Sequence, residues 1–190
     1  MKIDNICKKV LVSEEEIQAT VKKIGEQISK DYDGEEVTMI GLLNGCNPFF
    51  SDLLKHIDLL IEVDYMRASS YHGSIKSSNE VLILKDLDKS IKGKNVIVVD
   101  DIIDTGETLK CIIELLKLKG AKTIEACVLL DKDIKRNVAY KPKYIGLKIP
   151  KEFVVGYGLD YNEHYRNLPY IGAVKDEVYT KEENNNEWRK

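Results

Sequence analysis

The chain has 190 residues, 43% of them hydrophobic and 32% charged, and a formal net charge of -3. This length suits one domain with a sizeable core, and this composition is typical of a soluble globular protein. The charge gives no basic surface for nucleic acid, no stretch approaches the roughly 18 apolar residues of a membrane span, and the first residues lack the apolar run of a secretory signal. We therefore expect a single cytoplasmic domain, residues 1–190, that binds neither nucleic acid nor membranes.

The first quarter of the chain predicts a helix, a strand and a second helix. Residues 13–30 favour a helix, because Ser13 and Glu16 form a capping box and apolar residues then recur on one face. A buried strand is expected over residues 36–43, followed by a turn that contains glycine. Pro48 stands where a helix begins, at its first position.

The same alternation continues through the middle of the chain. The helix expected there runs over residues 107–120 and is closed by Gly120. Strands are expected over residues 59–69, 80–87, 94–101 and 122–130, with a polar loop at 69–80. Strands that alternate with helices indicate an α/β fold with a mainly parallel sheet, whose ligands gather at the carboxyl ends of the strands.

The last third of the chain has short strand-like pieces and little helical periodicity. We expect the N-terminal segment and residues 143–174 to form a small hood over the sheet. The remaining residues, 175–190, are polar enough to predict a frayed tail.

The run VIVVDDIIDTGET, residues 96–108, holds the main candidate site. Residues 96–99 predict a buried strand, and residues 100–108 a loop at its carboxyl end that enters a helix. The first amides of that helix have no helical partner, and the hydroxyls of Thr105 and Thr108 stand among them. This combination favours a phosphate site.

Three acids in this run, Asp100, Asp101 and Asp104, need a different explanation. Carboxylates repel a phosphate, so they fit either a sugar diol that donates hydrogen bonds or a magnesium ion. A phosphorylated ribose with a metal meets both requirements. A solvated acidic loop that caps a helix would account for one or two acids, but poorly for three followed by Thr-Gly-x-Thr.

Five stretches, which form four motifs, carry a resemblance to a known family. VIVVDDIIDTGETL resembles the ribose-phosphate motif of type I phosphoribosyltransferases. IGLLNGCNPFFSDLL is similar to the pyrophosphate loop of the hypoxanthine-guanine phosphoribosyltransferases, and VDYMRASSY to the strand that enters their catalytic lid. LLDKDIKR and KPKYIGLKIPKEFVVGYGLDYNEHYRNLPYIG resemble their purine-binding end. The resemblance covers residues 10–174, in order.

This resemblance implies the type I phosphoribosyltransferase fold and a reaction. The family transfers the phosphoribosyl group of 5-phosphoribosyl 1-pyrophosphate to N9 of a 6-oxopurine, hypoxanthine or guanine. The products are IMP or GMP and pyrophosphate, and the route is purine salvage. The resemblance further implies Mg²⁺ as cofactor and assembly as a homodimer or homotetramer.

The resemblance assigns the acids of the opening motif to separate tasks. Asp100 and Asp101 would hold the ribose hydroxyls, directly or through Mg²⁺, and Asp104 would act as general acid/base at N7 of the purine. The residues that would wrap the 5'-phosphate are Asp104, Thr105, Gly106, Glu107 and Thr108.

The purine would be recognised by later residues. Lys132 would donate to O6 of the purine, an acceptor that adenine lacks. Phe153 would stack on the ring and Val154 would offer backbone contacts. Asp160 would bind a second Mg²⁺, and Arg166 would grip the pyrophosphate.

The pyrophosphate loop departs from the family pattern. Asn44 stands beside Gly45 where many members carry a lysine. If the loop binds through its backbone amides, the loss is tolerable; if the charge matters, Arg136 and Arg166 would compensate.

The segment SSYHGSIKSSNE matches the lid of the family, in which Ser70 and Tyr71 would close over the reacting centre and exclude water. Two other classes stay open. A regulatory module of the same fold could sense the sugar donor without catalysis, but it would lack a complete purine end. A phosphoryl-accepting receiver domain places its paired acids after its first strand, whereas here they follow position 99.

Overall fold

The computed structural model describes residues 6–70, 81–136 and 140–178. The helices and strands are β1 (Cys7–Val12), α1 (Glu14–Asp31), β2 (Val37–Leu43), α2 (Asn47–Leu54), β3 (Ile61–Ser70), β4 (Val81–Lys85), β5 (Asn95–Ile103), α3 (Glu107–Leu118), β6 (Thr123–Lys132), β7 (Tyr144–Ile149), β8 (Val154–Val155) and β9 (Ile171–Val174). None of these helices is long and apolar enough to cross a membrane.

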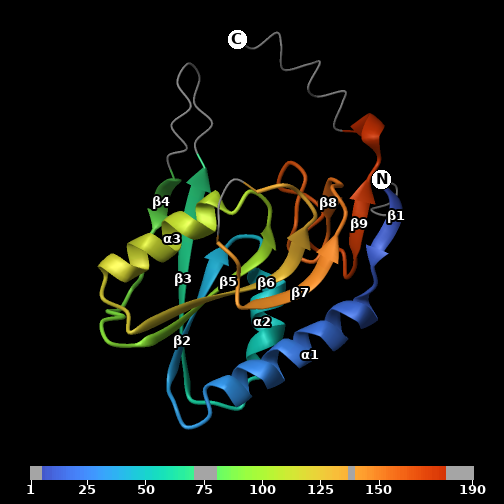
Figure 1. Cartoon of the computed structure of the whole chain (residues 1–190). Helices are drawn as coiled ribbons and strands as arrows, with labels where there is room; N and C mark the ends of the chain where they lie inside the picture. The colour runs from blue at the N-terminus through green and yellow to red at the C-terminus, as the bar shows by residue number, and fades with distance from the viewer. Residues whose placement is uncertain (1–5, 71–80, 137–139, 179–190) are drawn as a thin grey trace.

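The main sheet has the strand order β4-β3-β2-β5-β6-β7. All neighbouring strands are parallel except β3 and β4, which are antiparallel. Helices α1 and α2 pack on one face of this sheet and α3 on the other (Figure 1). This architecture confirms the predicted α/β fold with a mainly parallel sheet flanked by helices.

Burial of β5 on both faces explains its unbroken apolar sequence. Ile97 and Val99 belong to the core beneath α1 and α2, whereas Val96 and Val98 belong to the core beneath α3. A strand covered on both faces needs apolar residues at every position. β5 is therefore a rigid support for the residues at its carboxyl end.

Helix α1 begins as its sequence predicts. The Ser13 Oγ accepts a hydrogen bond from the Glu16 N–H at 3.2 Å, and the Ser13 N–H donates to Glu16 Oε2 at 2.9 Å. These reciprocal bonds satisfy two amides that the helix leaves unpaired. Ile17, Val21 and Ile28 then lie buried on the face that meets the sheet.

The hood is a separate antiparallel sheet with the strand order β1-β9-β8. This sheet brings the two ends of the described chain side by side, because β1 at its beginning pairs with β9 close to its end. In Figure 1 it stands beside the carboxyl ends of β6 and β7. The predicted tail is described only as far as residue 178, and 179–190 lie outside the described residues.

Two predicted boundaries were wrong. The hood was expected to begin at residue 143, but Tyr144–Ile149 pairs in parallel with β6 and completes the main sheet. The strand was expected to end at residue 99 or 101, but β5 continues to Ile103, because Asp100 and Ile103 still pair with β6. In both places the neighbouring strand, which local sequence does not reveal, decides the structure.

Candidate active site

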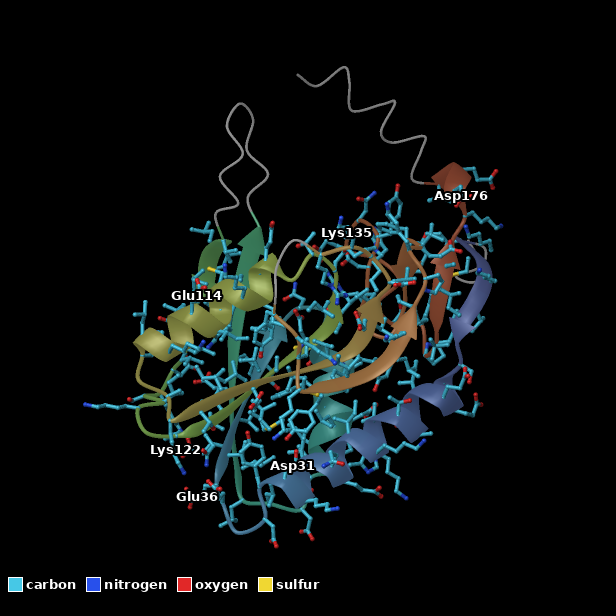
Figure 2. The ribbon with its side chains drawn as sticks, viewed as in Figure 1. Asp31, Glu36, Glu114, Lys122, Lys135 and Asp176 are labelled. Atoms are coloured by element: carbon cyan, nitrogen blue, oxygen red, sulfur yellow. The ribbon has the colours of Figure 1, made fainter. Side chains whose placement is uncertain are left out.

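The predicted site residues gather where the parallel strands end. The loops that leave β2, β5 and β6 meet there, and the hood lies beside them (Figure 1). In Figure 2, Lys135, which follows β6, is labelled at this end, whereas Glu36 and Lys122 are labelled at the opposite end.

Asp100 and Asp101 occupy the end of β5 rather than a loop, and they are partly buried. Burial, together with the charge of Asp101, raises the pKa of Asp100 well above its usual value. Burial also raises the pKa of Asp101, although a hydrogen bond with Asp100 and the positive charge of Arg166 oppose the shift. Such a pair gains from a nearby cation or from hydrogen-bond donors.

The loop of residues 44–46, between β2 and α2, approaches Asp101 very closely. A Cβ atom on Gly45 would lie only 1.7 Å from Asp101 Oδ2. On its other side, the Gly45 carbonyl oxygen would lie 1.9 Å from a Cβ on Gly158, a hood residue with φ +99°. Both positions therefore require glycine, and their backbones bring the loop, the strand end and the hood into contact.

The phosphate loop, residues 104–108, comprises the three residues that connect β5 to α3 and the first two residues of that helix. Gly106, with φ 82°, precedes the first residue of α3, and the Glu107 N–H donates to Thr105 Oγ1 at 3.4 Å. A cavity of about 140 Å³ lies against this loop. Its lining residues are Asp100, Ile102, Ile103, Asp104, Thr105, Gly106, Thr108 and Leu109. The amides at the start of α3 thus border a hollow that also contains one acid of the pair.

Lys132 and Asp104 come together although they are 28 residues apart. The Lys132 Nζ lies 2.9 Å from Asp104 Oδ2. The lysine side chain is largely covered, at 17% exposure, whereas that of Asp104 is 50% exposed. The parallel pairing of β5 and β6 produces this contact, because it brings the ends of the two strands side by side.

Arg136 was considered only as a charge that could replace the missing lysine of the pyrophosphate loop, and the contacts that it makes were not predicted. Its guanidinium donates to the carbonyl oxygens of Ile103 at 2.9 Å, Asp104 at 2.6 Å and Lys132 at 2.9 Å. It also bonds to the Asp131 carboxylate. Arg136 therefore ties the phosphate loop to the end of β6. Sequence could not indicate this, because carbonyl partners are present at every residue.

Phe153 and Val154 lie together at the start of the short hood strand β8. Phe153 is 38% exposed, and its ring contacts the ring of Tyr161 edge-on, with centroids 5.6 Å apart. Val154 is buried and pairs with Ala173 of β9. The pairing of Val154 in the hood sheet thus holds the adjacent Phe153 at the surface of the hood.

Arg166 organises the loop of the hood that contains Asp160. Its guanidinium lies 2.9 Å from Asp160 Oδ1 and 3.0 Å from Glu163 Oε2, and it donates to the Gly158 carbonyl at 2.8 Å. Asp160 Oδ2 also accepts from the Glu163 N–H at 2.9 Å. Arg166 therefore reaches the site already oriented by this loop.

A cavity of about 510 Å³, here named the loop–hood cavity, is lined by residues that follow β2 and by residues of the hood. Its lining residues are Leu43, Asn44, Asn47, Pro48, Gly158, Arg166 and Asn167. Asn44 is exposed at its edge, after a cis peptide bond from Leu43. Asn44 and Arg166, which were both assigned to pyrophosphate, thus face one hollow.

The lid is described only in part. Ser70 is the last residue of β3 and pairs with Val81 of β4, whereas Tyr71 lies outside the described residues. The role of this pair stays a prediction.

The acids also decide which metal the site could hold. Within the described ranges, no three His, Cys, Asp or Glu side chains form a cluster able to hold an ion by themselves. Asp100 and Asp101 offer only carboxylate oxygens, the donors that Mg²⁺ prefers. Because Mg²⁺ is commonly bound by one or two carboxylates plus substrate phosphates, these residues fit it.

Comparison with known proteins agrees with this geometry. The family model of the phosphoribosyl transferase domain matches residues 11–162. The chain is 51% identical over 179 residues to the hypoxanthine-guanine phosphoribosyltransferase of Lactococcus lactis, which covers 94% of this chain and 97% of that protein. It is 51% identical over 176 residues to the enzyme of the same name from Staphylococcus aureus, with 93% and 98% covered.

Solved structures agree as well. The crystal structure of a hypoxanthine phosphoribosyltransferase from Staphylococcus aureus superposes with a TM-score of 0.88 at 51% identity, over 92% of this chain and 95% of that chain. Motifs, fold and likeness coincide, and the chain belongs to the phosphoribosyltransferase family, in its hypoxanthine-guanine group.

Proposed function

We propose that this protein transfers the 5-phosphoribosyl group of 5-phosphoribosyl 1-pyrophosphate to N9 of hypoxanthine or guanine. Pyrophosphate leaves, and IMP or GMP is formed in purine salvage. The observation that carries this proposal is the pairing of Lys132 with Asp104 next to the partly buried acids Asp100 and Asp101.

The sugar would lie over the end of β5. Asp100 and Asp101 hold its hydroxyls, while the amides and hydroxyls of residues 104–108 bind its 5'-phosphate. As the bond to pyrophosphate breaks, positive charge develops on the ribose. The fixed carboxylates stabilise that charge without having to reorganise.

The purine edge would meet Lys132 and Asp104. On this edge O6 accepts a hydrogen bond and, when N9 carries the free lone pair, the neighbouring N7–H donates one. A lysine ammonium 2.9 Å from a carboxyl group matches this acceptor and donor. Lys132 donates to O6, and Asp104 holds or moves a proton at N7 as general acid/base. Phe153 stacks on the ring and Val154 contacts its far edge, so the base is held from two sides.

The pyrophosphate would occupy the loop–hood cavity. The amides around Asn44 and Gly45 bind it as a nest, and Arg166 donates to it with charge assistance. Asp100 and Asp101 would supply the carboxylates for one Mg²⁺, and Asp160 for a second. When bound, Mg²⁺ makes pyrophosphate a better leaving group. Ser70 and Tyr71 close over the centre and exclude water.

A direct assay tests this function. The protein is mixed with Mg²⁺ and 5-phosphoribosyl 1-pyrophosphate and offered hypoxanthine, guanine, xanthine or adenine in turn. We expect nucleotide from hypoxanthine and guanine and little from adenine. No product from any 6-oxopurine would contradict the enzyme, and binding of the sugar donor without product would favour the regulatory module.

We also propose that the protein works in the cytoplasm and assembles as a homodimer or homotetramer. Exposed apolar side chains on β3 and β4, those of Val63, Leu82 and Leu84, support self-association. Sedimentation equilibrium measures the assembly, and a monomer at micromolar concentration would contradict it.

A further inference from the structure

Tyr157 lies in an unusual turn of the hood. The three consecutive residues Gly156, Tyr157 and Gly158 have φ angles of 102°, 48° and 99°. Positive φ is unfavourable for a tyrosine, so the surrounding structure must hold this residue in place. The Tyr157 N–H donates to the Leu168 carbonyl at 2.8 Å, and the residue is only 7% exposed.

The hydroxyl of Tyr157 reaches out of the hood to helix α2. It donates to Asp52 Oδ2 at 2.7 Å. The same oxygen accepts from Gln18 Nε2 of α1 at 3.0 Å, and Asp52 Oδ1 lies 2.7 Å from Lys55 Nζ. A hydroxyl bonded to a carboxylate is one of the stronger hydrogen bonds in proteins. This contact therefore ties the hood to both helices beneath the sheet.

The two partners are connected to opposite walls of the loop–hood cavity. Helix α2 begins immediately after the loop of residues 44–46, so Asp52 is rigidly joined to Gly45. Gly158, next to Tyr157, lies against the Gly45 carbonyl group, and its own carbonyl oxygen accepts a hydrogen bond from Arg166 at 2.8 Å. Neither Tyr157 nor Asp52 lines the cavity itself.

Resting on the proposed function, we propose that Tyr157 and Asp52 are positioning residues for the pyrophosphate group. Their hydrogen bond sets the spacing between the loop of residues 44–46 and Arg166. It thereby controls how tightly the sugar donor is held, while purine binding, which uses Lys132 and Phe153, depends on it much less.

Removal of the hydroxyl tests this role. In Tyr157→Phe, we expect the KM for 5-phosphoribosyl 1-pyrophosphate to rise about fivefold, because the lost hydrogen bond acts on donor binding only through the position of the loop and Arg166, so that only part of its free energy is expressed there. The KM for hypoxanthine should stay near its wild-type value. Asp52→Ala should raise the donor KM at least as much, because it also removes the contacts with Gln18 and Lys55. The double variant should be no worse than Asp52→Ala, because both changes remove the bond between Tyr157 and Asp52.

The chain offers a matched control. Tyr144 is also buried, and its hydroxyl donates to Asp31 Oδ2 at 2.9 Å at the other end of α1. Figure 2 labels Asp31 there, away from the hood. Tyr144→Phe should lower the unfolding temperature as Tyr157→Phe does, but leave the donor KM unchanged. An equal rise in both variants, or no rise in Tyr157→Phe, overturns the proposal.

A binding experiment separates this inference from the proposed function. Isothermal titration with magnesium pyrophosphate needs no turnover. Weaker binding by Tyr157→Phe than by wild type and Tyr144→Phe supports the positioning role, even if the wild type makes no nucleotide. Equal binding by all three proteins counts against it.

Discussion

Two cavities of about 510 Å³ lie at opposite ends of the main sheet, and the acidic residues near the two ends are arranged differently, although Asp100 and Asp101 do not line the loop–hood cavity itself. At the amino end, where β2, β3 and β5 begin, the charges pair with each other: Lys94 lies 2.6 Å from Glu62, and Lys122 lies 3.1 Å from Glu35. At the carboxyl end, Asp100 and Asp101 stand side by side, and burial raises the pKa of both. Similar volume therefore says little, whereas unbalanced buried charge indicates a site for chemistry.

The largest effect should come from Asp104→Asn at the carboxyl end. We expect kcat with hypoxanthine to fall by about 10²- to 10⁴-fold, the usual contribution of a general acid or base. Both KM values should change little, because asparagine keeps the size of the side chain. Steady-state kinetics measure this. The amino-end variant Glu62→Gln should keep wild-type turnover, and unchanged turnover in Asp104→Asn would remove the acid/base role.

Lys132→Ala should affect the choice of base. Loss of a charged donor to O6 should reduce the preference for hypoxanthine over adenine by about 10- to 100-fold. The ratio of the two kcat/KM values measures it. Lys94→Ala, which removes a lysine at the amino-end cavity, serves as the control and should leave the ratio alone. A preference unaltered by Lys132→Ala would count against the contact with O6.

Gly45→Ala should weaken the grip on the sugar donor. The added methyl group would overlap the carboxylate of Asp101, so the loop has to move. We expect the donor KM to rise about tenfold, since small displacements of a binding group are costly. Gly93→Ala is the control: Gly93 lines the amino-end cavity, has φ +76° and meets nothing within 4 Å. Gly93→Ala should lower the stability of the protein and leave the donor KM unchanged. An equal change of KM in both variants would refute the steric explanation.

The smallest effect concerns stability in acid at the amino end. The hydrogen bond from Lys94 holds the pKa of Glu62 below its usual value of 4.5. A lowered folded-state pKa contributes stability above the usual pKa, and this stability is lost as the pH falls through the lowered pKa. At pH 7 the wild type should therefore have a slightly higher unfolding temperature than Glu62→Gln, and this difference should shrink as the pH falls. Thermal unfolding from pH 7 to pH 3 measures it; a difference that widens in acid would be the opposite result.

Local sequence predicted those parts of the fold that depend on local interactions. The capping box of Ser13 and Glu16 and the buried run of residues 96–99 each carry their signal within a few neighbours. The end of β5 and the sheet membership of Tyr144–Ile149 depend instead on pairing with β6. The sequence pattern within each segment does not predict which strand it pairs with.

The candidate site divides in the same way. Asp100, Asp101 and Asp104 are close in sequence, and their clustering alone raised the question of a ligand. The resemblance assigned Lys132 and Asp104 to the purine, but the contact between them needed the structure, because 28 residues separate them. Arg136 and the bond between Tyr157 and Asp52 needed the structure, since their partners are carbonyl groups or lie 105 residues away.

The guanidinium of Arg136 has a consequence for experiments on acidity. Three of its four partners are carbonyl oxygens, which do not titrate, and arginine keeps its proton throughout the pH range of enzyme assays. The hydrogen bonds by which Arg136 connects the phosphate loop to β6 are therefore almost insensitive to pH. A change of rate with pH then reports on the reacting groups and the substrates, and the scaffold that carries them stays constant.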